Sequence, residues 1–98
     1  MTIDDIIRQL DARKQRATYG AVGGLPGYQQ ASSMSGRPRD YLNSWVVAAT
    51  TSSHTGSRRG YPTGYAVDQI HPECLRQIRQ HSANIIQDAD ALRRWLAG

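Results

Sequence analysis

The fold of this chain is decided by residues 37–47, which read RPRDYLNSWVV. An arginine-rich loop passes there into the apolar pair Val46 and Val47, and this pattern predicts a buried β-strand over residues 44–50. A second basic loop, residues 51–60, follows the strand and contains glycine, serine and arginine. The sequence therefore places one strand at its centre with a basic loop on either side.

The composition indicates one small basic domain spanning residues 1–98. A chain of 98 residues can bury one modest core, and a hydrophobic content of 39% predicts short elements joined by polar connections. The net charge is +4 and Lys14 is the only lysine, so arginine carries most of the positive charge. Because the guanidinium group is a planar fork of donors suited to phosphate and to base edges, this balance favours nucleic acid over an acidic protein as the partner.

Residues 2–14 predict the clearest helix of the sequence. Thr2 is placed to cap it, and Asp5 stands where the acid of a capping box belongs. One apolar stripe runs along this helix at the spacing i, i+3, i+4 and i+7, and it consists of Ile3, Ile6, Ile7 and Leu10. We therefore expect the helix to dock on the core, and we assign no function to its charges.

The outline of a helix-turn-helix follows this first helix. Thr18 can cap a short helix over residues 18–25, the Pro-Gly pair at 26–27 breaks the chain, and residues 28–35 predict a polar helix. Each glycine destabilises a helix by about 1 kcal/mol against alanine, so tertiary contacts must hold the first helix of this pair. Such an outline is typical of DNA-binding helix pairs, although short helix pairs also occur in domains that touch no DNA.

The second half of the chain predicts a small sheet and two further helices. Residues 66–67 are expected to return to the strand at 44–50, which makes the basic loop between them resemble a wing. The remaining elements are a helix that opens at residues 70–72, a strand at 85–86 and a helix over 88–96. We therefore predict an α+β, winged-helix-like domain with a helical N-terminal half, a short antiparallel sheet and a C-terminal helix.

Four short stretches occur in an order that is typical of a known family. They are TYG at residues 18–20, GLPGY at 24–28, LNSWVV at 42–47 and YPTGYAV at 61–67. In this order and local pattern, over residues 15–80, the chain resembles the DNA-binding domain of O6-alkylguanine-DNA alkyltransferases and alkyltransferase-like proteins. The resemblance implies a non-enzymatic DNA-binding module of the winged-helix type, with a role in DNA repair, that recognises a flipped or modified base.

The chain departs from the family pattern at places that bear on its chemistry. Asn43 stands where the family has the cysteine that accepts the alkyl group, so self-alkylation is expected to be absent. Alkyltransferase-like proteins also lack this cysteine and still recognise alkylated guanine. The family's helix arginine, which fills the gap left by a flipped base, has no counterpart in residues 29–32, and the stretch between Tyr19 and Val46 is shorter. The chain is therefore either a distant relative or a winged helix that converged on the same pattern.

The candidate site residues divide into DNA contacts and a pocket. Arginine can neutralise backbone phosphates, and tyrosine presents a face on which a base can stack. The candidate DNA contacts are Tyr19, Gln29, Gln30, Arg37, Arg39, Arg58 and Arg59. The candidate pocket residues are Asn43, Tyr61, Thr63 and Tyr65. Trp45 is assigned to the core instead, because a chain without phenylalanine needs its tryptophans for packing.

Metal binding and catalysis are less well supported by the sequence. His71, Cys74 and His81 have a metal-like spacing, but a tetrahedral site needs a fourth ligand and no acid is well placed for it. We therefore expect no metal and no cofactor. An enzyme that uses Cys74 with a histidine lacks an orienting acid and an oxyanion site, so this interpretation is the least favoured.

One alternative to DNA binding stays open. The basic face can belong to a small protein-interaction or regulatory domain that contacts an acidic protein, with pairs such as Arg39 and Asp40 acting as ordinary surface ion pairs. The single cysteine excludes an internal disulfide. The longest apolar run, residues 45–49, is far shorter than the ~20 residues of a membrane span, so we expect no membrane partner and a cytoplasmic location.

Overall fold

The computed structural model describes residues 2–25 and 37–98 of the chain. The elements in these ranges are, in order, α1 (Ile3–Arg13), β1 (Arg16–Thr18), α2 (Tyr19–Gly23), the 3-10 helix η2 (Leu42–Trp45), β2 (Val46–Val47), the 3-10 helix η3 (Val67–Gln69), α3 (Pro72–Arg79), β3 (Ile85–Ile86) and α4 (Ala89–Ala97). None of the described helices is long and apolar enough to cross a membrane. The polar helix predicted over residues 28–35, with Gln29 and Gln30, lies outside the described residues.

A three-stranded parallel sheet forms the centre of this small α+β domain, with the strand order β2-β1-β3. Ala17 of β1 pairs with Val46 of β2 on one side and with Ile86 of β3 on the other. The predicted antiparallel sheet is therefore wrong. Helices separate the strands along the chain, because α2 and η2 lie between β1 and β2 and α3 lies between β2 and β3. Such helical crossovers bring the next strand back in the same direction.

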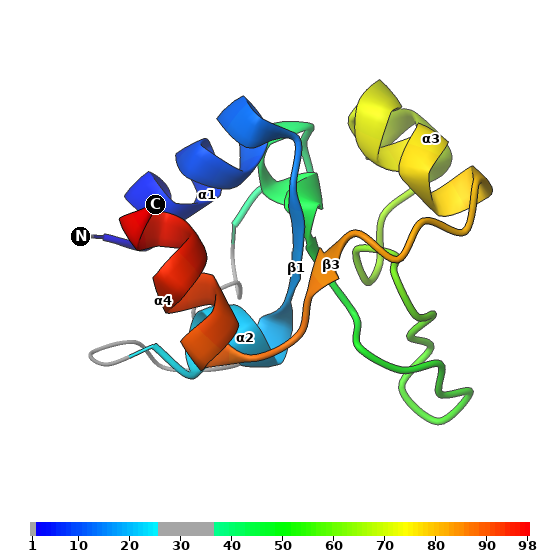
Figure 1. Ribbon diagram of the computed structural model, residues 1–98. Helices are drawn as coiled ribbons and strands as arrows, with labels where there is room; N and C mark the ends of the chain where they lie inside the picture. The colour runs from blue at the N-terminus through cyan, green and yellow to red at the C-terminus, as the bar shows by residue number, and fades with distance from the viewer. Residues whose placement is uncertain (1, 26–36) are drawn as a thin grey trace.

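The helices surround the sheet from several sides (Figure 1). In this view α1 and α4 lie to one side of β1, α3 lies to the other side, and α2 closes the lower end. The helix α2 packs against α4, and α1 packs against η2. The core between these elements contains fully buried apolar side chains, among them Ile6, Ile7, Leu10, Val22, Trp45, Val46 and Leu92. The predicted docking of α1 through its isoleucine and leucine stripe is confirmed.

The helix starts predicted within the described residues are confirmed. At three of them, a capping side chain accepts a bond from a backbone N–H three residues further along the chain. The Oγ1 of Thr2 accepts a bond from the Asp5 backbone N–H, and the Asp5 carboxylate accepts one from the Thr2 N–H, which completes the capping box. Thr18 caps α2 and Asp88 caps α4 in the same way. The helix α3 begins with Pro72 in its first position.

The strand predictions were less accurate. The strand predicted over residues 44–50 contains only Val46 and Val47, because η2 occupies the chain up to residue 45. The return strand predicted at residues 66–67 is wrong, because residue 67 begins η3. The sheet instead uses β1 as its central strand, and the sequence pattern had not predicted β1. The short strand β3 at residues 85–86 is confirmed.

Candidate nucleic-acid interface

The second basic loop, residues 51–60, and the residues on either side of it fold back on the end of β2. The backbone N–H of Gly60 donates to the carbonyl of Ala48, and the N–H of Ala48 donates to the carbonyl of Tyr61, both over 2.9 Å. Near the tip, Ser52 and Ser57 form an antiparallel bridge. These bonds hold both ends of the loop together, so Arg58 and Arg59 are presented next to the sheet at a defined place.

A concave cavity of about 590 Å³ lies between this loop, the end of α3 and the segment that leads into β3. Its lining residues are Arg16, Thr51, Arg58, Arg59, Gly60, Tyr61, Ile78, Arg79, His81, Ser82, Ala83 and Ile85. Four of these are arginines and one is a histidine, whereas none of the described lining residues is an aspartate or a glutamate. We call this space the arginine cavity. Its lining favours a negatively charged ligand.

Arg16 contributes to the wall of the arginine cavity from the central strand. Arg16 is only 2% exposed. Its guanidinium group donates to Gln77 Oε1 at 3.2 Å, to the Gly60 carbonyl at 3.2 Å and to the Ser82 carbonyl at 2.8 Å. Burial lowers the pKa of the Arg16 guanidinium. No ion pair joins Arg16 to a carboxylate within the described ranges. Among the described residues, this buried cation is therefore held by hydrogen bonds to neutral groups.

Arg58 and Arg59 face the arginine cavity from the basic loop. The guanidinium of Arg58 lies over the ring of Tyr61, 4.3 Å from its centroid, in a cation–π contact. The backbone N–H of Arg59 donates to Thr51 Oγ1 over 3.0 Å, which orders the residue while its side chain stays exposed. The structure therefore brings Arg58 and Arg59, predicted as DNA contacts, together with Tyr61, predicted as a pocket residue, in the lining of one cavity.

Arg79 and His81 close the cavity from the C-terminal end of α3. Arg79 is the last residue of the helix, and His81 follows the C-cap residue Gln80. The backbone of His81 has a φ of 53°, a left-handed conformation that few residues other than glycine adopt. A bond from the His81 N–H to the Ile78 carbonyl, over 3.1 Å, completes the helix end. This turn directs the chain along the cavity and places Ser82 and Ala83 in its lining.

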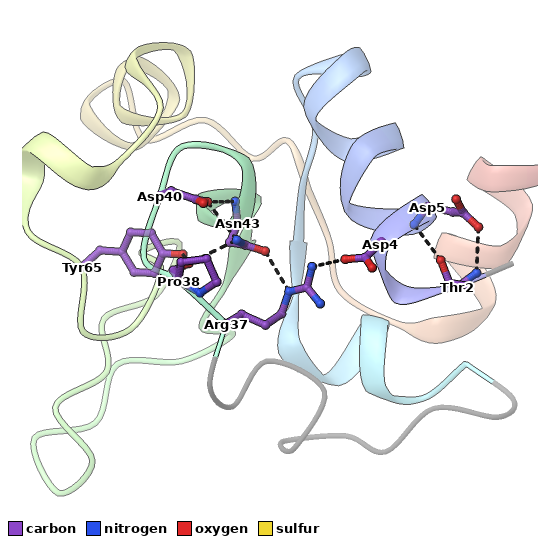
Figure 2. A network of polar contacts seen from close by, with 8 residues as sticks. All are labelled: Thr2, Asp4, Asp5, Arg37, Pro38, Asp40, Asn43 and Tyr65. Carbon is purple, nitrogen blue, oxygen red and sulfur yellow. Dashed lines mark hydrogen bonds and ion pairs between the residues drawn. The ribbon is translucent and has the colours of Figure 1, made fainter.

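The first basic loop, residues 37–41, is tied to α1 through Arg37 and to η2 through Asn43 (Figure 2). None of its residues lines the arginine cavity. Arg37 forms an ion pair with Asp4 of α1, and its Nε donates to Asn43 Oδ1 over 2.9 Å. The amide nitrogen of Asn43 donates to the Pro38 carbonyl at 3.1 Å and to Asp40 Oδ1 at 2.8 Å. Asn43 is only 3% exposed, so these bonds use a buried amide to brace the loop.

The remaining predicted residues lie close to this braced loop. The phenol oxygen of Tyr19 accepts a bond from the Thr63 backbone N–H over 2.9 Å, and the hydroxyl of Tyr65 donates to the Pro38 carbonyl over 3.5 Å. Burial raises the pKa of Tyr65 to about 12. The guanidinium of Arg39 lies against Gly64, where a Cβ atom would stand 3.0 Å from it. Residues 61–65 are therefore fixed between α2 and the first basic loop.

The structure thus separates the predicted site residues into two groups. Arg58, Arg59 and Tyr61 line the arginine cavity, whereas the other described ones surround the first basic loop, namely Tyr19, Arg37, Arg39, Asn43, Thr63 and Tyr65. Among the basic cavity residues, sequence reasoning missed three, namely Arg16, Arg79 and His81. One signal was available, because residues 41–67 and 74–87 contain neither aspartate nor glutamate. Two acid-free stretches that carry arginine meet at the cavity.

Cys74 and the histidines near it serve packing and capping. The Cys74 thiol is fully buried, donates weakly to the Ser44 carbonyl over 3.5 Å, and has a pKa raised to about 12 by burial. The Nδ1 of His71 accepts a bond from the Glu73 backbone N–H over 3.0 Å, which caps α3. In the part of the chain that the structure describes, no three histidine, cysteine, aspartate or glutamate residues form a group that could hold a metal ion.

Comparison with family models, with curated proteins and with solved structures finds no match for this chain.

Proposed function

We propose that the protein is a non-enzymatic DNA-binding module of the alkyltransferase-like, winged-helix type, which contacts duplex DNA through its second basic loop. The observation that carries this proposal is the arginine cavity, whose described lining combines four arginines and a histidine with no carboxylate. A positive surface of this kind attracts the phosphate backbone, which supplies most of the affinity in non-specific DNA binding. In this proposal residues 48–61 act as the wing, and α2 belongs to the helix-turn-helix.

The distribution of ion pairs supports a phosphate-binding role for this region. Four basic side chains of the described residues pair with carboxylates elsewhere, and these are Lys14, Arg37, Arg76 and Arg93. Arg58, Arg59 and Arg79 form no such pair within the described ranges. Together with Arg16, they place four arginines without a carboxylate partner among the described residues at the arginine cavity, and Arg8, Arg13, Arg39 and Arg94 are the other described basic residues without such a pair. Arg39, which also lacks an ion pair to Asp40, adds a further donor near Gly64.

Base recognition is assigned to residues 61–65 in this proposal. This segment begins at Tyr61, beside the cavity, and ends at Tyr65, beside the first basic loop. Tyrosine rings in a braced loop offer stacking surfaces at a low entropic cost, because their backbone is already ordered. Asn43, which stands where the family carries its reactive cysteine, bonds to Arg37 and Pro38 and so holds the first basic loop in place.

The first test replaces Arg58 and Arg59 together by alanine. Each phosphate contact releases condensed counterions, so log affinity should fall with log salt by about 0.9 per contact, and the double variant should lower this slope by about 1.8. Binding should weaken on every duplex sequence alike. Fluorescence anisotropy at several salt concentrations gives the slope.

The matched control is the double variant Arg93→Ala/Arg94→Ala, which removes the same charge from exposed positions of α4 outside the cavity lining. It should keep the wild-type slope. If the wild-type protein binds duplex more weakly than about 10⁻⁴ M near physiological salt, DNA binding is refuted. The basic face then belongs to the protein-interaction alternative, which titration with an acidic protein partner would examine.

A second test concerns the absence of alkyl transfer. Asn43 offers no thiol, and the only cysteine, Cys74, is buried with its pKa raised to about 12, so its thiol stays protonated near neutral pH. Incubation with an O6-alkylguanine oligonucleotide should leave the mass of the protein unchanged. A stoichiometric gain of one alkyl group in the mass spectrum, mapped to Cys74, would show that the protein is an enzyme.

A further inference from the structure

The arginine cavity has the volume and the charge of a site for the end of a ligand. Its volume of about 590 Å³ falls in the range of small-molecule sites. Arg16 lies in its wall while only 2% of the residue is exposed. A ligand group that reaches Arg16 must therefore enter the cavity, whereas Arg58 and Arg59 stay exposed at the loop and can be touched from outside. A buried donor such as Arg16 is reached more easily by a group at the end of a ligand than by a group that is bonded on both sides.

The guanidinium of Arg16 has N–H groups that can still donate to such a ligand group. A guanidinium carries five N–H groups, and three of them are used by the bonds to Gln77, Gly60 and Ser82. Two N–H groups, one on each terminal nitrogen, are left over by the bonds to the described residues. Because these three bonds come from α3, the basic loop and the segment before β3, the orientation of the guanidinium is set in advance. A preorganised donor pair costs little further ordering when an anion arrives.

The charge around Arg16 suits a dianion. Arg59 and Arg79 face the same cavity from opposite elements, and Thr51 and Ser82 add hydroxyl groups to the lining. A phosphodiester carries one negative charge and two free oxygens between two sugars. A phosphomonoester carries about two charges and three free oxygens at the end of a molecule, so it can use more of these donors and reach Arg16.

We propose that the arginine cavity binds a phosphomonoester, either the 5′-phosphate at a DNA strand end or the phosphate of a free nucleotide. Arg16 receives the phosphate oxygens at the inner wall, and Arg59 and Arg79 hold it from the two sides. This inference rests on the proposed function where the phosphate belongs to DNA, since the basic loop serves both. The cavity would then direct the module to strand ends bearing a phosphate.

The experiment compares four probes by fluorescence or calorimetric titration of the full chain. They are a short duplex with 5′-phosphates, the same duplex with 5′-hydroxyls, thymidine 5′-monophosphate and thymidine. A single charge-assisted phosphate site should give about a tenfold or greater preference for the phosphorylated member of a pair. Inorganic phosphate should compete with that member. If only the duplex pair shows a preference for the phosphorylated member, the phosphate belongs to a DNA strand end. If only the nucleoside pair shows it, the ligand is a free nucleotide.

Variants of the exposed rim locate the site without risking the fold. Arg79→Ala should abolish most of the preference for the 5′-phosphate, whereas Arg94→Ala, which removes the same charge from α4, should leave it unchanged. In an amide NMR spectrum, thymidine 5′-monophosphate should shift the resonances of Gly60 and Ser82 and not those of α4. Arg16→Gln, which keeps hydrogen-bond donors but removes the charge, should lose the preference if its spectrum remains that of a folded protein.

The outcomes separate the two proposals. Equal binding of the phosphorylated and unphosphorylated members of both pairs overturns the phosphate site and leaves duplex binding standing. Binding of thymidine 5′-monophosphate without any duplex binding supports the phosphate site and overturns the DNA-binding function. A preference for 5′-phosphate that Arg79→Ala and Arg94→Ala reduce equally also overturns the site, because general charge attraction then explains it.

Discussion

Trp45→Ala is expected to remove a large part of the free energy that keeps this domain folded. Truncation of a buried tryptophan costs about 3–5 kcal/mol, and a small domain has only about 5–15 kcal/mol of stability in total. Trp45 is fully buried, its indole Nε1 donates to Asp11 Oδ1 over 2.9 Å, and its ring lies 5.1 Å from that of His71. The substitution therefore removes the largest core side chain and the partner of a carboxylate on α1. Urea unfolding followed by circular dichroism measures the loss.

Trp95→Ala is the matched control for this prediction. Trp95 lies on α4, is only partly buried, and contacts Arg13, whose guanidinium stands 4.4 Å from its ring centroid. The same substitution there should cost clearly less than at Trp45, because less apolar area leaves water when this side chain packs. A Trp45→Ala protein that folds normally but no longer binds DNA would contradict the core assignment and would place Trp45 in the binding site.

Gly60→Ala is expected to lower the free energy of unfolding strongly, because the substitution is unfavourable for two separate reasons. Gly60 has a φ of 81°, and a left-handed backbone costs about 1–2 kcal/mol for a residue with a Cβ atom. That Cβ would stand 2.9 Å from Nη1 of Arg16, closer than any ordinary contact. Since Arg16 is buried and its guanidinium is held by three bonds, moving it should add about 1–3 kcal/mol.

Gly56→Ala separates these two costs experimentally. Gly56 lies in the same loop with a φ of 73°, and nothing stands within 4 Å of its added Cβ. It should therefore show only the backbone cost in chemical unfolding, and it should leave the arginine cavity unchanged. Equal destabilisation by the two substitutions would contradict the close contact between Gly60 and Arg16, and with it the preorganised position of that guanidinium.

Sequence reasoning was accurate where the decisive interactions are local. The predicted Thr2–Asp5 capping box and the predicted Thr18 cap of α2 each join residues only a few positions apart, and so does the Asp88 cap found at the start of the predicted C-terminal helix. The apolar stripe of α1 and the buried pair at β2 are likewise visible as short-range periodicity. Such signals depend only on residues within one or two helical turns of each other, so they do not depend on how distant segments pack.

The candidate site was predictable only in part for the same reason. The arginines of two loops were enough to predict a basic region, and Arg58, Arg59 and Tyr61 do line one cavity. Arg37 likewise lies in an arginine-rich loop, yet Asp4, 33 positions away in sequence, pairs with it. No pattern within the first basic loop distinguishes an arginine that braces the fold from one that faces a ligand.

Packing between distant segments decided the remaining features. The central strand β1 has three residues, one of them a charged arginine, and neither alternation nor length marks it as a strand. It becomes a strand because β2 and β3 supply hydrogen-bonding partners on both sides, with α2, η2 and α3 forcing the parallel direction. The same arrangement buries Arg16 and carries it to the residues of α3 and the basic loop. Helix capping and short apolar runs are local properties of this sequence, whereas strand direction and the arginine cavity exist only once segments far apart in the sequence have packed together.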